Sequence, residues 1–371
     1  MKKVGFIVLY TLICMISVGY SQHFDESEAA VRSNNENDKS LASLNPLILP
    51  SSSFHSYIGW LNNHEILYAA QIDQLEYHII SYNICTAQTK IVLSEQGSLT
   101  QASLSPSKQS LLLHKADSTL NAEVSVFNLQ TKEKVWSHVI ESYELLYEWN
   151  EHDESKILFT AFESDWTYKV WLADINKKEW EEITGTPPFI AWSSLDKFVY
   201  QQWSSEINVP EAPVYEHFFD IDYSNQVKEA VLAFDLLQPF FMTVELGKEE
   251  KEFSYTFDRE GEIISTFTAP SVQMYSDWVI PKYDFIKSEN TFITFKPYKD
   301  GEYNTEENQF ALVSWDVEAS AETVIKDYVN NEPLSCSPDG AYCLMGFQYT
   351  SIIDMIDGDL ERFLIFEEEI Q

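Results

Sequence analysis

The sequence predicts an all-β fold, a β-propeller of four-stranded blades, and three observations favour this class. An apolar or aromatic residue, a short polar turn and a burst of strand-forming residues recur together at intervals of roughly 45 residues, a repeat length typical of propellers. Within each burst, apolar residues recur at every second position, as they do in strands. No long stretch shows the spacing of an amphipathic helix.

The repeats can be counted from the residue that opens each one. These openings fall at Trp60, Leu104, Trp149, Trp192, Phe234, Phe285 and Cys336. Seven openings predict seven blades. The repeat fades between Ser204 and Pro270, where prolines interrupt it and Phe234 is a weak marker. If that stretch forms one enlarged blade, six blades remain.

The third repeat shows how one blade is expected to form. Strands are predicted at 145–149, 156–162, 166–173 and 179–183, and the turn segments "NEHDES" and "DINKK" are rich in Asn, Asp and Lys, as tight hairpins require. Trp149 and Trp192 occupy equivalent positions in successive repeats. We therefore expect these two side chains to fill the wedge-shaped space between neighbouring blades.

Residues 1–53 are predicted to lie outside the propeller. Lys2 and Lys3 precede an uncharged apolar run, and residues 1–21 form the predicted signal peptide, with cleavage after Ser21. Lipidation at Cys14, which the bulky Ile13 disfavours, and a retained leader are the alternatives. Residues 22–53 are mainly polar and predict a disordered tether before the propeller at 54–371. We expect an extracytoplasmic protein, secreted or associated with the cell envelope.

The charge balance narrows the class of partner. The 371 residues carry 24 Lys and Arg against 59 Asp and Glu, which gives a formal net charge of −35. Such a charge repels nucleic acids and anionic lipid headgroups, so membrane contact is expected only through the N-terminal leader. A protein, peptide or glycan partner is expected instead, with the propeller itself a monomer.

Candidate binding residues come from the innermost strand of each blade. Side-chain direction alternates along a strand, so the residue before each repeat opening should face away from the packed side. These residues are Gly59, Ser103, Glu148, Ala191, Ala233, Asp284 and Ser335. Glu148 and Asp284 are the only carboxylates among them and belong to the third and sixth repeats, roughly opposite each other. They are candidates for a site near the axis, or for side chains that point to water at its mouth.

Three aromatic residues of the third repeat, Trp166, Tyr168 and Trp171, are also candidate binding residues, because they stand outside the repeated phrase. Two acidic clusters offer weak candidate Ca²⁺ ligands, since alternating carboxylates suit this cation, although neither cluster completes a twelve-residue calcium loop. The candidate ligands are Asp220, Asp222, Asp357 and Asp359. No other cofactor is expected.

The cysteines suggest one disulfide. Asp339 and Gly340 form a strong hairpin turn signal, and a hairpin centred between them places Cys336 directly opposite Cys343. Two buried thiols are the alternative, but export to an oxidising compartment favours the bond, with Cys85 left free.

Several segments resemble the YqgU-like β-propeller family of Gram-positive bacteria. They are "YIGWLNNHEILYAA" from Tyr57, "ESYELLYEWNEHDESKILFTAFESDWTYKVWLADIN" from Glu141 and "CSPDG" from Cys336. The resemblance implies an exported propeller of six blades and implies no catalytic residues. The "SPDG" phrase is similar, more broadly, to TolB-like propeller repeats, which implies binding of proteins or peptides.

Three functions remain open at this point. The sequence lacks a GxSxG nucleophile elbow, an HExxH motif and a Gly-rich phosphate loop, so a non-enzymatic binding module at the cell envelope is the favoured hypothesis. The first alternative is a propeller-type glycoside hydrolase or lyase that uses carboxylates such as Glu148 and Asp284. The second alternative is a structural envelope protein.

Overall fold

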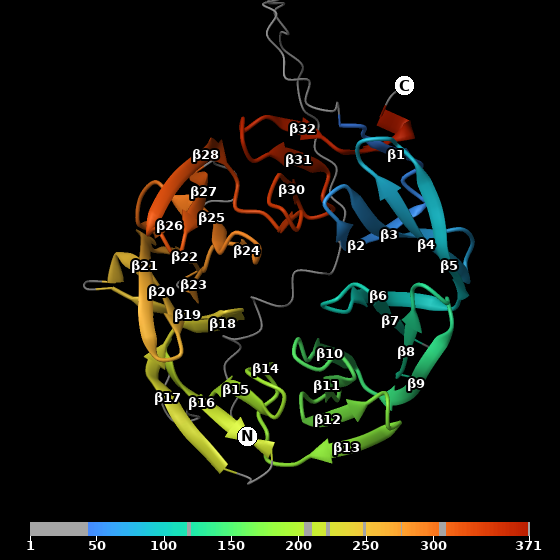
Figure 1. The fold of residues 1–371 in the computed structure, drawn as a ribbon, viewed down its shortest axis with the longest axis horizontal. Helices are drawn as coiled ribbons and strands as arrows, with labels where there is room; N and C mark the ends of the chain where they lie inside the picture. The colour runs from blue at the N-terminus through green and yellow to red at the C-terminus, as the bar shows by residue number, and fades with distance from the viewer. Residues whose placement is uncertain are drawn as a thin grey trace, which may run out of the picture. The chain divides into compact units, whose positions relative to one another are not determined.

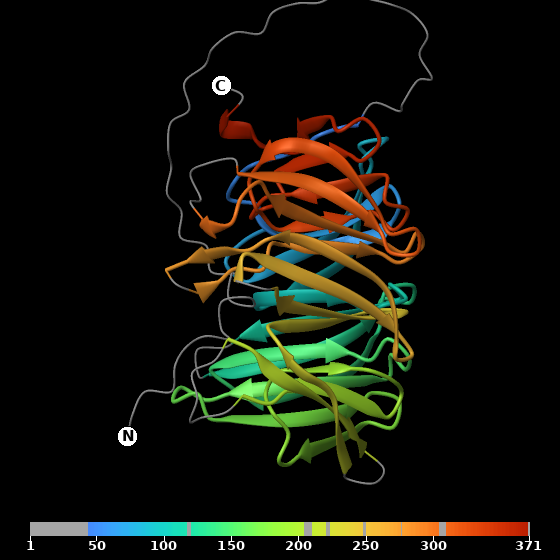
Figure 2. The ribbon, with the colours of Figure 1, turned by 90° about the vertical axis from the view of Figure 1, so that its left-hand side faces the viewer.

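The computed structural model describes residues 44–116, 120–203, 210–219, 223–247, 250–275, 277–303 and 309–369. Within these residues, seven four-stranded antiparallel sheets surround a common axis (Figure 1). Seen edge-on, the outer strands of successive blades cross the rim obliquely (Figure 2). The fold is an all-β propeller, as predicted. None of the helical segments in the described ranges combines the length and apolar character that a membrane span needs.

The first three blades follow the chain without interruption. The first contains β2 (Phe54–Asn62), β3 (Glu65–Gln71), β4 (Glu76–Asn83) and β5 (Thr89–Gln96). The second contains β6 (Ser98–Leu104), β7 (Ser110–Ala116), β8 (Asn121–Asn128) and β9 (Lys134–Glu141). The third contains β10 (Glu144–Trp149), β11 (Lys156–Phe162), β12 (Tyr168–Asp174) and β13 (Glu179–Ile183).

The next two blades occupy the stretch where the repeat fades. The fourth contains β14 (Ile190–Trp192), β15 (Lys197–Gln201), β16 (Ala212–Phe218) and β17 (Tyr223–Val231). The fifth contains β18 (Ala233–Leu237), β19 (Phe240–Leu246), β20 (Glu252–Arg259) and β21 (Glu262–Pro270). This stretch therefore holds the end of one blade and all of the next, and the described residues form seven blades rather than six.

The last two blades complete the ring. The sixth contains β24 (Tyr283–Ile286), β25 (Thr291–Pro297), β27 (Phe310–Asp316) and β28 (Ala321–Val329). The seventh contains β29 (Leu334–Cys336), β30 (Tyr342–Met345), β31 (Ser351–Asp354) and β32 (Leu360–Arg362), followed by β33 (Leu364–Phe366) and the short helix η3 (Glu367–Glu369). A small sheet of β22 (Val272–Met274), β23 (Asp277–Trp278) and β26 (Gly301–Glu302) is inserted beside the sixth blade.

The strands of the third blade test the sequence reading in detail. β11 and β13 have the predicted bounds, and β10 begins one residue earlier than expected. β12 begins at Tyr168 rather than Trp166, because Trp166 adopts a left-handed backbone with φ of 67° in the hairpin turn. A residue in that conformation cannot continue a strand.

The tryptophans that open the repeats pack between blades, as predicted. Trp149 is 7% exposed and belongs to a cluster that includes Val124 and Val126 of the second blade. Trp192 is 4% exposed and packs with Leu158 and Val170 of the third blade. The first strands of the third and fourth blades therefore pack against the sheet of the preceding blade.

The predicted tether was too long at its C-terminal end. Leu47–Leu49 forms strand β1, which pairs in parallel with β33, so that the first and last strands of the fold lie together. Leu47 and Leu49 are 4% and 7% exposed. The apolar segment "LNPLILP" explains the difference, because its alternate leucines can be buried only in the folded ring. The predicted signal peptide and residues 22–43 lie outside the described residues.

Candidate binding site near the ring axis

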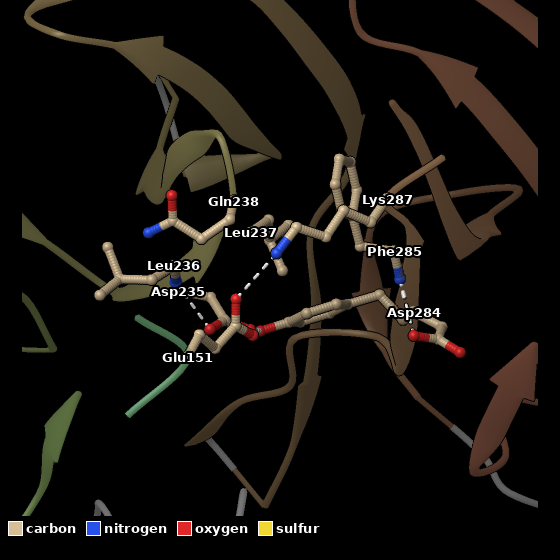
Figure 3. A pocket seen from close by; sticks show the side chains of 9 residues that line it. Glu151, Asp235, Leu236, Leu237, Gln238, Asp284, Phe285 and Lys287 are labelled. Carbon is tan, nitrogen blue, oxygen red and sulfur yellow. Dashed lines mark hydrogen bonds and ion pairs between the residues drawn. The ribbon is translucent and has the colours of Figure 1, made fainter. Parts of the chain in front are cut away.

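A cavity of about 360 Å³ lies near the axis of the ring, and Figure 3 shows it from close by. Its lining residues are Glu151, Asp235, Leu236, Leu237, Gln238, Tyr283, Asp284, Phe285 and Lys287. They come from β18, from β24 and from the turns that follow β10, β18 and β24. In a four-stranded antiparallel blade, the turns between first and second strands all lie at the same end. The cavity is therefore built at that end of the ring.

Asp235 lies on the cavity wall and is held by two hydrogen bonds. Its Oδ2 accepts the hydroxyl of Tyr283 at 2.8 Å, and its Oδ1 accepts the backbone N–H of Leu236 at 2.7 Å. Burial raises the pKa of Asp235, the two hydrogen bonds partly oppose this, and the negative charge of Glu151 raises the pKa further. A positive charge placed beside Asp235 would favour its ionised form and lower this pKa.

Asp284 lines the cavity, but both of its carboxylate oxygens accept hydrogen bonds from backbone N–H groups of the propeller. Its Oδ2 accepts the backbone N–H of Cys336 in the seventh blade at 2.6 Å, and its Oδ1 accepts the N–H of Phe285 at 2.7 Å. Burial raises the pKa of Asp284 to about 6, and nearby Asp235 adds to the rise. The two backbone hydrogen bonds and the positive charge of Lys108 act in the opposite direction.

Glu148 is not one of the cavity's lining residues in the part of the chain that the structure describes. Its Oε1 accepts the backbone N–H of Trp192 in the fourth blade at 2.8 Å. Burial raises the pKa of Glu148 to about 8 against the lowering effect of this hydrogen bond, and the charges of Asp235 and Glu151 raise it further. The two carboxylates singled out from the sequence are thus both bound to the backbone of the following blade.

Asp235 is the carboxylate that sequence reasoning missed. The repeat places Ala233 before the weak opening Phe234, but Asp235 lies two residues further on, on the same face of β18. The signal was present in the sequence. An aromatic residue, a carboxylate and a large apolar residue follow one another at 147–149, 234–236 and 283–285.

An ion pair joins two blades across this end of the ring. Lys287 Nζ lies 3.0 Å from Glu151 Oε2, and the two residues follow β24 of the sixth blade and β10 of the third (Figure 3). Their side chains are 65% and 44% exposed, respectively. Exposed pairs of this kind contribute about 0–1 kcal/mol, so the contact can open at little cost.

The three aromatic candidates do not form one site. Trp171 stacks on Trp180 at 5.3 Å between ring centroids and packs beside the cluster between the second and third blades. Trp166 and Tyr168 are 38% and 41% exposed. Both rings contact that of Phe162, with ring centroids 6.0 and 6.1 Å away, respectively. They belong to the hairpin between second and third strands, which lies at the opposite end of the blade from the cavity.

The weak Ca²⁺ candidates divide into two sets. Asp220 and Asp222 lie outside the described residues. Asp357 and Asp359 are exposed in the turn between β31 and β32, where Asp354 Oδ1 accepts the N–H groups of Ile356 and Asp357. Across the described ranges, no three His, Cys, Asp or Glu side chains are grouped so that they could hold a metal ion. In this second cluster, Asp354 therefore stabilises the turn between β31 and β32.

The predicted hairpin of the seventh blade has the expected register. Cys336 pairs directly with Cys343 in β29 and β30, their Cα atoms are 3.9 Å apart, and a disulfide joins them. Cys85 is the free cysteine of the described chain.

Comparison with known proteins identifies the family. The family profile described as "YqgU-like 6-bladed beta propeller domain" matches residues 83–346, more than half of the chain. The chain belongs to the YqgU-like β-propeller family. The described part of this YqgU-like propeller forms seven four-stranded sheets, one more than the family's description states.

One protein resembles this YqgU-like chain along its whole length, and two solved structures have a similar fold. "Uncharacterized lipoprotein YqgU" of Bacillus subtilis (strain 168) is 26% identical over 378 aligned residues, which cover 100% of this chain and 99% of the relative. The crystal structure of the uncharacterized protein lmo1340 from Listeria monocytogenes EGD-e matches with a TM-score of 0.81 at 18% identity, over 88% of this chain and 98% of that one. The propeller domain of the Trilobed protease from Pyrococcus furiosus matches with a TM-score of 0.54 at 14% identity, over 85% and 98%.

Proposed function

We propose that this protein is an exported, non-enzymatic propeller that acts as a binding module at the cell envelope, and that its partner inserts a group into the cavity between β18 and β24. The cavity is the observation that carries this proposal. Its lining combines the apolar side chains of Leu237 and Phe285 with polar groups, among which Asp235 and Tyr283 have pKa values that burial raises. Convergent polar groups beside apolar side chains in a concave site are typical of ligand sites.

Two features support a place at the cell envelope. Lys2 and Lys3 precede an uncharged apolar run, which is the layout of a secretory signal. The Bacillus subtilis relative is named a lipoprotein, which is consistent with an anchored location outside the cytoplasm. A protein, peptide or glycan partner fits this location.

The hydrogen bonds around the carboxylates favour binding over catalysis. Glycoside hydrolysis needs two carboxyl groups that flank the substrate and exchange protons with it. Both oxygens of Asp284 accept backbone N–H groups, and one oxygen of Glu148 does so away from the cavity. These carboxylates stabilise contacts between blades, which makes a glycoside hydrolase or lyase the weaker hypothesis.

Site-specific crosslinking in the exporting cell tests the proposal. A photoreactive amino acid at Gln238, on the cavity wall, is expected to form a defined adduct with the partner. The same group at Val139, 60% exposed on the outer strand β9, serves as the control and is expected to form none. Identical adducts from both positions, or none from Gln238, would contradict the proposed site.

The mature N-terminus tests export separately. Mass spectrometry is expected to find a chain that starts at Gln22, or one that starts at a lipid-modified Cys14 and is recovered with the membrane. Either result supports export. An intact leader on protein recovered from the cytosol would overturn it.

A further inference from the structure

The cavity already binds an ammonium group that belongs to the chain itself. Lys287 and Glu151 both line it, and the Lys287 ammonium lies 3.0 Å from the Glu151 carboxylate (Figure 3). The lysine reaches this carboxylate from the opposite side of the ring, from the sixth blade to the third. The geometry of a bound ammonium in this cavity is therefore present in the structure.

The remaining charges of the wall are not balanced by Lys287. The lining residues include the carboxylates of Glu151, Asp235 and Asp284 and a single cationic side chain, Lys287. Burial is the main cause of the raised pKa values of Asp235 and Asp284. The charge of Glu151 adds to the first and that of Asp235 adds to the second, although Lys108 lowers the pKa of Asp284. A second positive charge beside Asp235, between Glu151 and Asp284, would be stabilised by these carboxylates.

The internal ion pair is also easy to displace. The Lys287 side chain is 65% exposed and can return to water without the loss of a buried contact. Next to it, Leu237 and Phe285 offer apolar surface suited to the methylene stem of a long basic side chain (Figure 3). The formal charge of −35 favours the approach of a basic partner to the protein as a whole.

We propose that the group recognised in this cavity is a primary ammonium, that of a lysine side chain of a peptide or protein partner, which replaces Lys287 at Glu151 and lies beside Asp235. Lys287 then acts as an internal competitor that occupies the site in the absence of the partner. This inference rests on the proposed binding function and adds to it the chemistry of the recognised group.

Calorimetric titration of the mature protein with Nα-acetyl-lysine amide tests the inference. The neutral analogue Nα-acetyl-norleucine amide keeps the apolar stem and is the matched control ligand. We expect binding of the lysine derivative and none of the norleucine derivative. Equal heats from both ligands would overturn the inference, and so would preference for Nα-acetyl-arginine amide over the lysine derivative.

Two variants give effects of opposite sign. Asp235→Asn removes a charge but keeps an acceptor for Tyr283, and it is expected to weaken binding about tenfold. Lys287→Met removes the internal competitor and is expected to tighten binding. Lys296→Met, which breaks the Lys296–Glu322 ion pair of the same blade outside the cavity lining, is the control and should change nothing. Weaker binding by the Lys287→Met variant would contradict the competitor role.

Failure of this inference is distinguishable from failure of the proposed function. Adducts from Gln238 together with no binding of the lysine derivative would reject the ammonium as the recognised group and leave the cavity as the binding site. Absence of both would reject both proposals. Thermal unfolding of each variant confirms that the fold is retained.

Discussion

Glu148 and Trp192 join the innermost strands of two neighbouring blades by two hydrogen bonds, both of which Trp192 donates and Glu148 accepts. The backbone N–H of Trp192 donates to Glu148 Oε1 at 2.8 Å, and the Trp192 indole N–H donates to the backbone oxygen of Glu148 at 3.4 Å. Each of these two kinds of hydrogen bond recurs between other blades of the ring. Asp284 accepts the N–H of Cys336 at 2.6 Å, and the Trp60 indole donates to the backbone oxygen of Ser335 at 3.1 Å.

The first prediction concerns the side chain of Glu148. Glu148→Ala leaves the backbone N–H of Trp192 without this acceptor and is expected to lower the free energy of unfolding by about 1–3 kcal/mol. Glu148→Gln keeps an oxygen in the same place and should cost much less at neutral pH. Urea denaturation of both variants measures the difference. Equal losses would show that the carboxylate charge, and not the acceptor, is what matters.

The second prediction follows from the raised pKa of the same residue. The pKa of Glu148 is about 8 in the folded protein against an ordinary value of 4.5, so between these two values the folded state binds the additional proton. The contribution of Glu148 to stability is therefore fully present below about pH 4.5 and is lost as the pH rises towards 8. The stability difference between wild type and Glu148→Gln should shift in favour of the variant over this range. A difference that is constant from pH 5 to 8 would contradict the raised pKa.

The third prediction concerns Trp149 and Trp192, which fill the space between blades. Truncation of either to Ala is expected to cost about 3–5 kcal/mol in denaturant unfolding, because a large cavity is left between two sheets. Trp149→Phe should cost less than Trp149→Ala, since it keeps an aromatic ring and removes an indole N–H that has no hydrogen-bond partner within the described chain. Trp166→Ala, at a 38% exposed position, is the control and should cost little. A small loss for Trp192→Ala would mean that this side chain does not support the blade contact.

The features that could be predicted from the sequence are those that depend on residues close together along the chain. The spacing of the repeat predicts the blades, and the Asp339–Gly340 turn predicts that Cys336 lies opposite Cys343, because a tight turn determines the register of its own hairpin. The pairing of β1 with β33 could not be predicted in this way. A parallel pair of strands from the two ends of a chain has no turn to specify it.

The site was predicted only in part, for a similar reason. Strand alternation identified Asp284 as a residue that faces away from the packed side of its blade, and it lines the cavity. The cavity also depends on Glu151 and Lys287, which lie in the turns of two distant blades. How far a turn extends towards the axis depends on the packing of the whole ring, so these two residues gave no signal in the sequence.

The fourth prediction tests the pairing of the two ends of the fold. A chain that begins at Leu44 keeps β1, whereas one that begins at Ser51 loses it and exposes Leu364, which is 1% exposed in the intact ring. Loss of the buried Leu47 and Leu49 should lower the free energy of unfolding by roughly 3 kcal/mol or more. The chain from Leu44 should match the full mature protein in thermal unfolding. Equal stability of the two truncated chains would show that β1 does not hold the ring closed.

The last prediction concerns the disulfide between Cys336 and Cys343, which joins the first two strands of the seventh blade beside the N–H that Asp284 accepts. Titration of thiols in the unfolded mature protein should find one reactive cysteine, Cys85, without reductant, and three after reduction. The loop that this bond closes is short, so its loss in a Cys336→Ser/Cys343→Ser variant should lower stability only modestly. Its larger effect is expected on the adjoining contact, with faster hydrogen exchange of the Cys336-position amide than in the oxidised wild type. Three reactive thiols before reduction would show that the two cysteines are unbonded in the exported protein.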